Sequence, residues 1–273
     1  MKIGKWDFEI GRHTYVMGIL NVTPDSFSDG GNYVDRDAAL RHVEEMISQG
    51  MDILDIGGES TRPGFEKVSA QEEMARVIPM IQAVKERFSI PISLDTSKAE
   101  VAKEGILAGA DLINDVWGLR GDPQMRRVIA EGKVACCLMH NRNEADYDDF
   151  LPDVMRDLSE TLRLAGDAGI ALDKIILDPG VGFAKSYEQN LEVLANLHDF
   201  HQFGLPILLG TSRKSVIGNT LHLPVDQREE GTLATTVLAV ENKISFVRVH
   251  DVEKNKRAIL MTQAILSKRH SKD

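Results

Sequence analysis

The chain has 273 residues, of which 42% are hydrophobic and 27% are charged, and these values are typical of a globular protein with one sizeable core. A formal net charge of −10 at pH 7 argues against broad electrostatic binding to nucleic acid or to an anionic membrane, because either partner would be repelled over most of the surface. No apolar run approaches the roughly 20 residues of a membrane span, and the first residues lack the apolar core of a signal peptide, so we expect a cytoplasmic protein.

The first segment predicts a β-hairpin. Trp6, Phe8 and Ile10 alternate with other residues, and Gly11 interrupts the pattern before Tyr15. Alternation of this kind is typical of a half-buried strand, and glycine is typical of a turn. We expect the hairpin to close the floor of the fold that the following segments predict.

Eight short apolar runs then recur along the chain, and each suits a strand that is buried on both faces. They are YVMGIL, MDILDI, IPISLD, DLINDV, KVACCLM, KIILDP, LPILLG and ISFVRV. The fifth run holds the only two cysteines, Cys136 and Cys137, which a strand would point to opposite faces. We therefore expect both cysteines to pack in the core and to bind no metal.

Segments with helical periodicity separate these runs. Capping boxes are predicted at Ser69 to Glu72, Ser97 to Glu100 and Ser186 to Gln189. Strand and helix alternating eight times predict a parallel sheet, and eight such units close a (β/α)8 TIM barrel. An open doubly wound sheet is the alternative, but it needs a GxGxxG turn after an early strand, which this chain lacks. We expect a single domain over residues 1–273.

Polar residues stand at nearly every predicted strand end. In TIM barrels the chemistry comes from the carboxyl ends of the strands and from the loops that follow them. A polar residue at each end is more than packing needs, because a buried carboxylate is costly unless it is paired or hydrogen-bonded. The predicted funnel contains Asn21, Asp55, Asp95, Asn114, Asp115, Met139, His140, Asp178, the loop GTSRKS, Arg248 and His250.

Two groups within this funnel have distinct chemistry. Asp95, Asn114 and Asp178 can converge on a flat ligand that carries several N–H donors. A basic group could hold an anion, or it could simply pair with the carboxylates, and it consists of Arg62, Lys214, Arg248 and His250. Ion pairing alone does not explain the loop NVTPDSFSDGG, where an exposed Phe27 and a glycine pair predict a lid over a substrate.

Seven segments together resemble the dihydropteroate synthase family, in order and at the expected strand ends. They are MGILNVTPDSFSDGG, DIGGESTRPG, SLDTSKAEVA, LINDVWG, ILDPGVGFAK, GTSRKS and RVHDV. The resemblance runs from about Val16 to Ala258 and implies one pterin-binding TIM-barrel domain. The family condenses 6-hydroxymethyl-7,8-dihydropterin diphosphate with 4-aminobenzoate to give 7,8-dihydropteroate and diphosphate in folate biosynthesis. We therefore expect a transferase.

The resemblance also implies a role for each candidate residue. The pterin would be held by Asp95, Asn114, Asp178, Lys214 and Arg248. The diphosphate would lie near Asn21, Arg62, Arg248 and His250, with Mg²⁺ bound by Asn21 and by diphosphate oxygens. The 4-aminobenzoate pocket would be shaped by Phe27, Thr61, Pro63, Phe183 and Ser215, together with Lys214. The residues expected to act in catalysis are Asp95, Lys214 and Arg248.

A mechanism follows from this assignment. The C–O bond to diphosphate would break first and leave a pterin-methyl cation, stabilised by the ring and by Asp95, before the arylamine attacks. Loop one (Pro24 to Gly31) and loop two (Thr61 to Lys67) would fold over the site and exclude water. Because sulfonamides imitate 4-aminobenzoate, the resemblance implies that they inhibit this chain. It also implies a homodimer, for which the apolar stretch TLATTVLAV is a candidate interface.

Two other functions compete with this one. A pterin-binding methyltransferase that serves a corrinoid would use a similar barrel, but it would not need Arg62 or the pair Arg248 and His250. A non-catalytic pterin-binding paralogue should have lost residues such as Asn21 and Phe27, yet both are present.

Overall fold

All eight apolar runs contribute parallel strands to one sheet in the computed structural model, which describes residues 1–22, 33–59 and 68–269. The strand order is β8-β7-β6-β5-β4-β3-β10-β9, and a parallel bridge from Leu177 to Ile207 joins β8 to β9 and so closes the ring. The strands are β3 (Tyr15–Asn21), β4 (Ile53–Gly57), β5 (Ile92–Asp95), β6 (Leu112–Asp115), β7 (Ala135–Met139), β8 (Ile175–Asp178), β9 (Leu208–Leu209) and β10 (Phe246–Val249). The predicted TIM barrel is confirmed.

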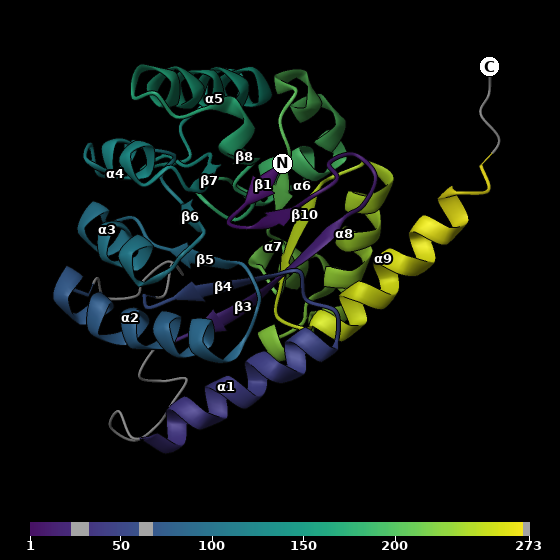
Figure 1. The fold of residues 1–273 in the computed structure, drawn as a ribbon. Coiled ribbons are helices and arrows are strands. Elements are labelled where there is room, and N and C mark those ends of the chain that lie inside the picture. The colour runs from purple at the N-terminus through teal and green to yellow at the C-terminus, as the bar shows by residue number, and fades with distance from the viewer. Residues whose placement is uncertain (23–32, 60–67, 270–273) are drawn as a thin grey trace.

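Helices surround this barrel (Figure 1). They are α1 (Tyr33–Ser48), α2 (Ala70–Arg87), α3 (Ala99–Ala108), α4 (Met125–Gly132), α5 (Phe150–Asp167), α6 (Tyr187–Ala195), α7 (Ser215–Leu221), α8 (Glu229–Glu241) and α9 (Val252–Leu266). Within the described ranges, short 3₁₀ helices lie between them: η2 (Leu172–Lys174), η3 (Leu197–Phe203) and η4 (Val225–Gln227). Among the helices of the described ranges, none is both long and apolar enough to cross a membrane.

The strands bury apolar side chains on both faces, and this produces two clusters. The larger cluster lies between the barrel and the helices and includes Cys136. The smaller one fills the inside of the barrel and includes Cys137. Both thiols are fully buried, and burial raises their pKa above the ordinary range. The cysteines therefore point to opposite faces and pack in the core, as the sequence predicted.

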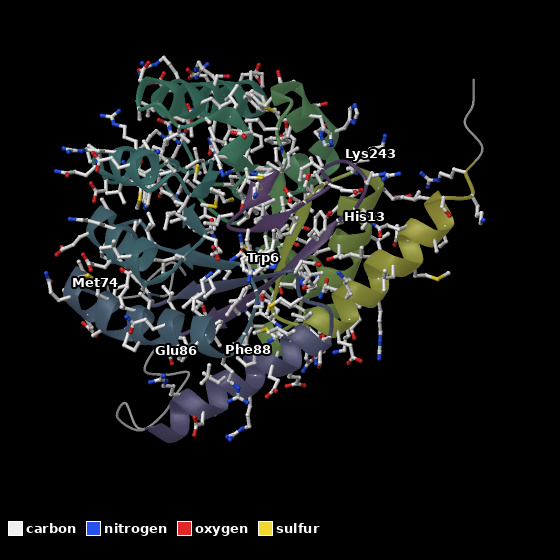
Figure 2. The ribbon with its side chains drawn as sticks, in the orientation of Figure 1. Trp6, His13, Met74, Glu86, Phe88 and Lys243 are labelled. Atoms are coloured by element: carbon white, nitrogen blue, oxygen red, sulfur yellow. The ribbon has the colours of Figure 1, made fainter. Side chains whose placement is uncertain are left out.

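A short hairpin, β1 (Lys2–Ile3) and β2 (Trp6–Asp7), covers the centre of the barrel, where Figure 2 labels Trp6. Ile3 and Phe8 join the inner cluster and close the floor. Gly11, with φ of +85°, does lie in a turn, over residues 10–12, but the hairpin itself reverses at Gly4, where φ is +58° and an added Cβ would lie 2.3 Å from Asp111. Glycine meets both demands of this turn.

The predicted helix caps are correct in two of three cases. Ser69 accepts from the Glu72 backbone N–H, and Ser186 forms a full capping box with Gln189. The box predicted at Ser97 is wrong, because α3 begins after Lys98. The Ala99 backbone N–H donates instead to Asp122, at 2.9 Å, from the loop before α4. A residue distant in sequence thus provides the cap.

Candidate active site

The polar residues at the mouth of the barrel face inward because strand side chains alternate. Each residue that a barrel strand contributes to the inner cluster is followed two positions later, towards the carboxyl end of the strand, by another inward-facing position. As a result, the side chains that line the barrel interior are apolar at the floor and polar at the mouth. It aligns Ile53 with Asp55, Leu112 with Asn114, Ile176 with Asp178, Leu208 with Gly210, and Phe246 with Arg248 and His250.

Strand register brings four of these positions to one level. Asn21 pairs with Gly57, Gly57 with Asp95, and Asp95 with Asn114 across β3, β4, β5 and β6. Because Gly57 has no side chain, space remains between its neighbours. A Cβ built there would lie 3.8 Å from Asp95 Oδ2 and 3.9 Å from Asn21 Oδ1. The structure thus brings together the predicted metal ligand and two predicted pterin residues.

Arg248 links Asp95, at this level, to Asp55, which lies below it. Its Nε donates to Asp55 Oδ2 at 2.7 Å, and its terminal nitrogen donates to Asp95 Oδ2 at 2.8 Å. Ser93 donates its hydroxyl to the other oxygen of Asp55, at 2.5 Å. Asp55 and Ser93 are fully buried, and Asp95 is 8% exposed. The basic group therefore does pair with the carboxylates in part, and Asp55 holds Arg248 against the barrel wall.

Asp178 and Lys214 meet on the other side of the mouth, around Gly210. A Cβ at Gly210 would lie 3.7 Å from Lys214 Nζ, 3.8 Å from Asp178 Oδ2 and 3.9 Å from Arg248 Cβ. Asp178 Oδ1 accepts from the Gly180 backbone N–H at 2.7 Å, so Oδ2 is the oxygen that lies towards Gly210. We call Asp95, Asn114, Asp178, Lys214 and Arg248 the polar ring.

Burial shifts the pKa values of the ring. It raises the pKa of Asp95 to about 7, although Arg248 opposes the rise. It also raises the pKa of Asp178, against the attraction of Lys214. Burial lowers the pKa of Lys214 to about 8, with Asp178 opposing. For Arg248, Asp55 and Asp95 outweigh burial and raise the pKa. Perturbed groups that converge at a barrel mouth are typical of a catalytic site.

The remaining described candidates lie beside the ring. His250 follows β10, and its Nδ1 lies 2.9 Å from the hydroxyl of Ser212. Phe183 follows β8, with its ring centroid 4.7 Å from Lys214 Nζ. Ser215 is the first residue of α7, directly after Lys214. The predictions for Arg62, Phe27, Thr61 and Pro63, and for the whole of both predicted loops, fall outside the residues that the structure describes.

Two other funnel residues do not face the ligand space. Asp115 accepts from the backbone N–H groups of Trp117 and Leu119, at 2.9 and 2.7 Å, so it shapes the turn after β6. His140 lies one position beyond Met139 and therefore on the outer face of β7, where its Nε2 is 3.1 Å from Asp157 on α5. Alternation explains both why Met139 points inward and why the His140 ring does not border the ligand space.

Sequence reasoning gave no individual role to several contributors to the site, although two of them, Gly210 and Ser212, lie in the predicted loop GTSRKS. Ser93 and Ser212 orient Asp55 and His250 through hydroxyl groups, and Gly57 and Gly210 create space by having no side chain. The period-2 pattern could have found Ser93, which lies two residues before Asp95 on the same face. Within the described residues, no three His, Cys, Asp or Glu side chains form a metal site.

This arrangement can hold a flat, hydrogen-bonding heterocycle inside a barrel. Carboxylates and an amide offer acceptors, while Lys214 and Arg248 offer donors in a largely buried setting. Such a ligand could carry an anion towards Asn21 and His250, at neighbouring strand ends.

Comparisons with known proteins agree with this geometry. Residues 17–250 match the family described as pterin binding enzyme. The dihydropteroate synthase of Clostridium beijerinckii is 57% identical over 267 residues, which cover 97% of this chain and 99% of that protein.

Two crystal structures are also similar over nearly their full length. Dihydropteroate synthase from Clostridium difficile, in the presence of pteroic acid, has a TM-score of 0.93 and 50% identity, covering 96% of this chain and 100% of that chain. The Yersinia pestis enzyme in a sulfonamide drug complex has a TM-score of 0.91 and 42% identity, covering 98% and 99%. The chain therefore belongs to the dihydropteroate synthase family of pterin-binding enzymes.

Proposed function

We propose that this chain joins 6-hydroxymethyl-7,8-dihydropterin diphosphate to 4-aminobenzoate, releasing diphosphate and forming 7,8-dihydropteroate in folate biosynthesis. The observation that carries the proposal is the polar ring with the space left by Gly57 and Gly210. A pterin is flat and has an edge of N–H donors, which matches carboxylate and amide acceptors. Family membership and the Clostridium difficile structure obtained with pteroic acid support the same activity.

In this proposal the pterin lies inside the polar ring. Asp178 Oδ2 and the Asn114 amide oxygen accept from the amino and N–H edge of the pterin, while Lys214 donates to acceptor atoms of the pterin. The Arg248 guanidinium, which Asp55 holds, lies along the pterin plane. Asp95 is the carboxylate next to the diphosphate side, because register places Asn21 two strands away at the same level.

Asn21, Arg248, His250 and Arg62 hold the diphosphate and its metal. The side-chain amide oxygen of Asn21 is a suitable ligand for Mg²⁺. A coordination shell with one protein ligand, phosphate oxygens and water is common for this ion. Bound Mg²⁺ would neutralise negative charge on the departing diphosphate. Ser212 lies against His250 Nδ1 and so constrains the imidazole orientation.

The reaction then needs no nucleophile from the protein. The C–O bond breaks with its electron pair going to diphosphate, and Asp95 stabilises the pterin-methyl cation through its negative charge. The arylamine nitrogen forms the new C–N bond and loses a proton. Full turnover by Asp95→Asn, or diphosphate release that strictly requires the arylamine, would contradict this sequence of steps.

The 4-aminobenzoate lies outside the pterin, against Phe183, Lys214 and Ser215, with Phe27, Thr61 and Pro63 completing its pocket. Phe183 supports this position because it follows β8 beyond Asp178 and its ring contacts the Lys214 ammonium, which borders the Gly210 space. Sulfonamides would occupy the same place as inhibitors, as the Yersinia pestis complex suggests by analogy. The single domain over residues 1–273, the homodimer and the cytoplasmic location stay predictions.

The test is a turnover assay with chromatographic detection of dihydropteroate. Purified protein is incubated with dihydropterin diphosphate, Mg²⁺ and 4-aminobenzoate, beside Asp178→Ala and the matched surface variant Asp173→Ala. Asp173 is exposed in η2, so its loss should leave turnover unchanged, whereas Asp178→Ala should abolish it. Absence of product from the unmodified chain, with the pterin still bound, would instead favour the non-catalytic paralogue.

A further inference from the structure

Lys185 lies at the end of the turn after β8, and its ammonium group has three acceptors. Nζ lies 2.9 Å from His140 Nδ1, 2.9 Å from the Gly180 carbonyl oxygen and 3.1 Å from the Phe183 carbonyl oxygen. An ammonium group has three N–H donors, so all of them are satisfied. No carboxylate of the described residues forms an ion pair with this lysine. The contacts of Lys185 therefore fix two backbone carbonyl groups and do not neutralise a carboxylate.

The turn that Lys185 binds has an unusual backbone. Gly180 and Gly182 have φ of +75° and +85°, and Ala184 has φ of +42°, which is uncommon for a residue with a side chain. A Cβ at Gly180 would lie 1.9 Å from the carbonyl oxygen of His140. Side chains outside the polar ring brace this conformation. Tyr147 donates its hydroxyl to the Ala184 carbonyl at 2.9 Å, Asn190 Oδ1 accepts from the Gly182 backbone N–H at 2.5 Å, and Lys185 binds two further carbonyls.

The same turn shapes the polar ring. The Gly180 backbone N–H donates to Asp178 Oδ1, and the Val181 carbonyl accepts from Lys214 Nζ at 2.5 Å. Phe183 presents its ring to the same Lys214 ammonium. The turn thus fixes the orientation of one ring carboxylate and the position of one ring cation. Anything that holds the Gly180 and Phe183 carbonyls in place also holds Asp178 and Lys214.

We propose that Lys185 is a positioning residue for the pterin pocket, and that Asp157 and His140 provide its acceptor by fixing the imidazole tautomer. This inference rests on the proposed function, because it assigns the pterin to the polar ring. Lys185 touches neither substrate in this proposal. It acts through the turn from Gly180 to Phe183.

The tautomer follows from the contacts on the two ring nitrogens. An ionised carboxylate can only accept, so Nε2 must carry the proton that it donates to Asp157 at 3.1 Å, and this leaves Nδ1 of the neutral imidazole as the acceptor for Lys185. Arg142 Nε also donates to Asp157, at 2.7 Å, and holds the carboxylate in place. Burial lowers the pKa of His140 to about 4, so the imidazole is neutral and able to accept. Burial also lowers the pKa of Lys185 to about 7.

Variants of Lys185 and His140 test the proposal. Lys185→Met removes the donor, His140→Leu removes the acceptor, and His140→Asn keeps a side-chain oxygen close to the place of Nδ1. Lys103→Met, at an exposed position of α3, is the matched control. For each folded variant, the KM for dihydropterin diphosphate, kcat and the thermal midpoint are measured beside the unmodified chain.

We expect Lys185→Met and His140→Leu to raise the pterin KM by roughly tenfold to a hundredfold, as a displaced binding group does, with a smaller change in kcat. His140→Asn should stay within about threefold of the unmodified chain. The double variant Lys185→Met/His140→Leu should be no worse than Lys185→Met alone, because His140 acts on the turn only through Lys185. Lys103→Met should change nothing.

Lower thermal midpoints with unchanged pterin KM in Lys185→Met and His140→Leu would overturn the proposal and leave a purely structural role. If Lys185→Met does not fold, the two His140 variants decide by the same KM criterion. Equal KM values for His140→Leu and His140→Asn would overturn the assignment of Nδ1 as the acceptor. Absence of turnover from the unmodified chain would contradict the proposed function instead, so the two failures are distinguishable.

Discussion

The substitution Gly210→Ala should reduce the space available to the substrate without destabilising the folded protein. In the free protein a Cβ at this position meets its nearest neighbours at 3.7 to 3.9 Å, which is ordinary van der Waals contact, and the backbone φ lies outside the left-handed region. The variant should therefore fold without strain. It should even gain about 0.4–1 kcal/mol, because alanine restricts the unfolded chain more than glycine does. For a protein of this size that corresponds to a rise in Tm of roughly 1–4 °C.

The same methyl group occupies the space between Lys214, Asp178 and Arg248, where we propose that the pterin ring lies. One methyl-sized group in a fitted pocket changes binding by about 1–3 kcal/mol, or roughly 10-fold to 200-fold. We therefore expect the KM for dihydropterin diphosphate to rise by this factor while the folded state becomes slightly more stable. Steady-state kinetics and thermal unfolding on the same preparation measure both effects.

Gly166→Ala is the matched control for this experiment. Gly166 is exposed in α5, and a Cβ there meets nothing within 4 Å, so the substitution should raise Tm and leave the KM unchanged. An unaltered pterin KM in Gly210→Ala would refute the reasoning, because the ring could not then lie against Gly210. A large fall in Tm would instead show that the local packing differs from the structure.

Three further predictions concern protonation, capping and the metal. The reaction needs ionised Asp95 and protonated Lys214. The kcat/KM for the pterin should therefore rise with pH through about 7 and fall beyond about 8. In a measured pH profile, Lys214→Arg should remove the fall at alkaline pH. Asp122→Ala should cost about 1 kcal/mol, or roughly 2–4 °C in Tm, while Ser97→Ala leaves Tm unchanged; the opposite order in a thermal scan would restore the capping box at Ser97. Chelation should abolish turnover, and Asn21→Ala should raise the Mg²⁺ concentration that restores half of it by several-fold; identical Mg²⁺ titrations would argue against Asn21 as a ligand.

The barrel was predictable because its strands are continuous apolar runs, and because alternation and parallel register follow directly from such runs. The same two regularities explain why Asp95 and Asn114 meet at one level. The hairpin turn was less predictable, since Gly4 and Gly11 both lie in turns and only Gly4, which packs against Asp111, joins the two hairpin strands.

The sequence could not predict which buried polar groups would form hydrogen bonds with each other. Asp55 bonds Ser93, 38 residues away, and Arg248, 193 residues away, and no local pattern specifies such a pairing. His140 was placed wrongly for a different reason. Its position at a strand end predicted that it lines the ligand space, but its side chain faces outward and contacts α5. The comparisons establish the family, and the roles of individual residues stay predictions.

The closed floor has a consequence for the order of events in catalysis. Ile3 and Phe8 fill the amino end of the barrel, so both substrates and both products must pass through the same opening. In the proposed arrangement the pterin lies deeper than the 4-aminobenzoate, and the inner substrate cannot pass an occupied outer site. Binding should therefore be sequential, with the arylamine second, and high concentrations of 4-aminobenzoate should slow the entry of the next pterin.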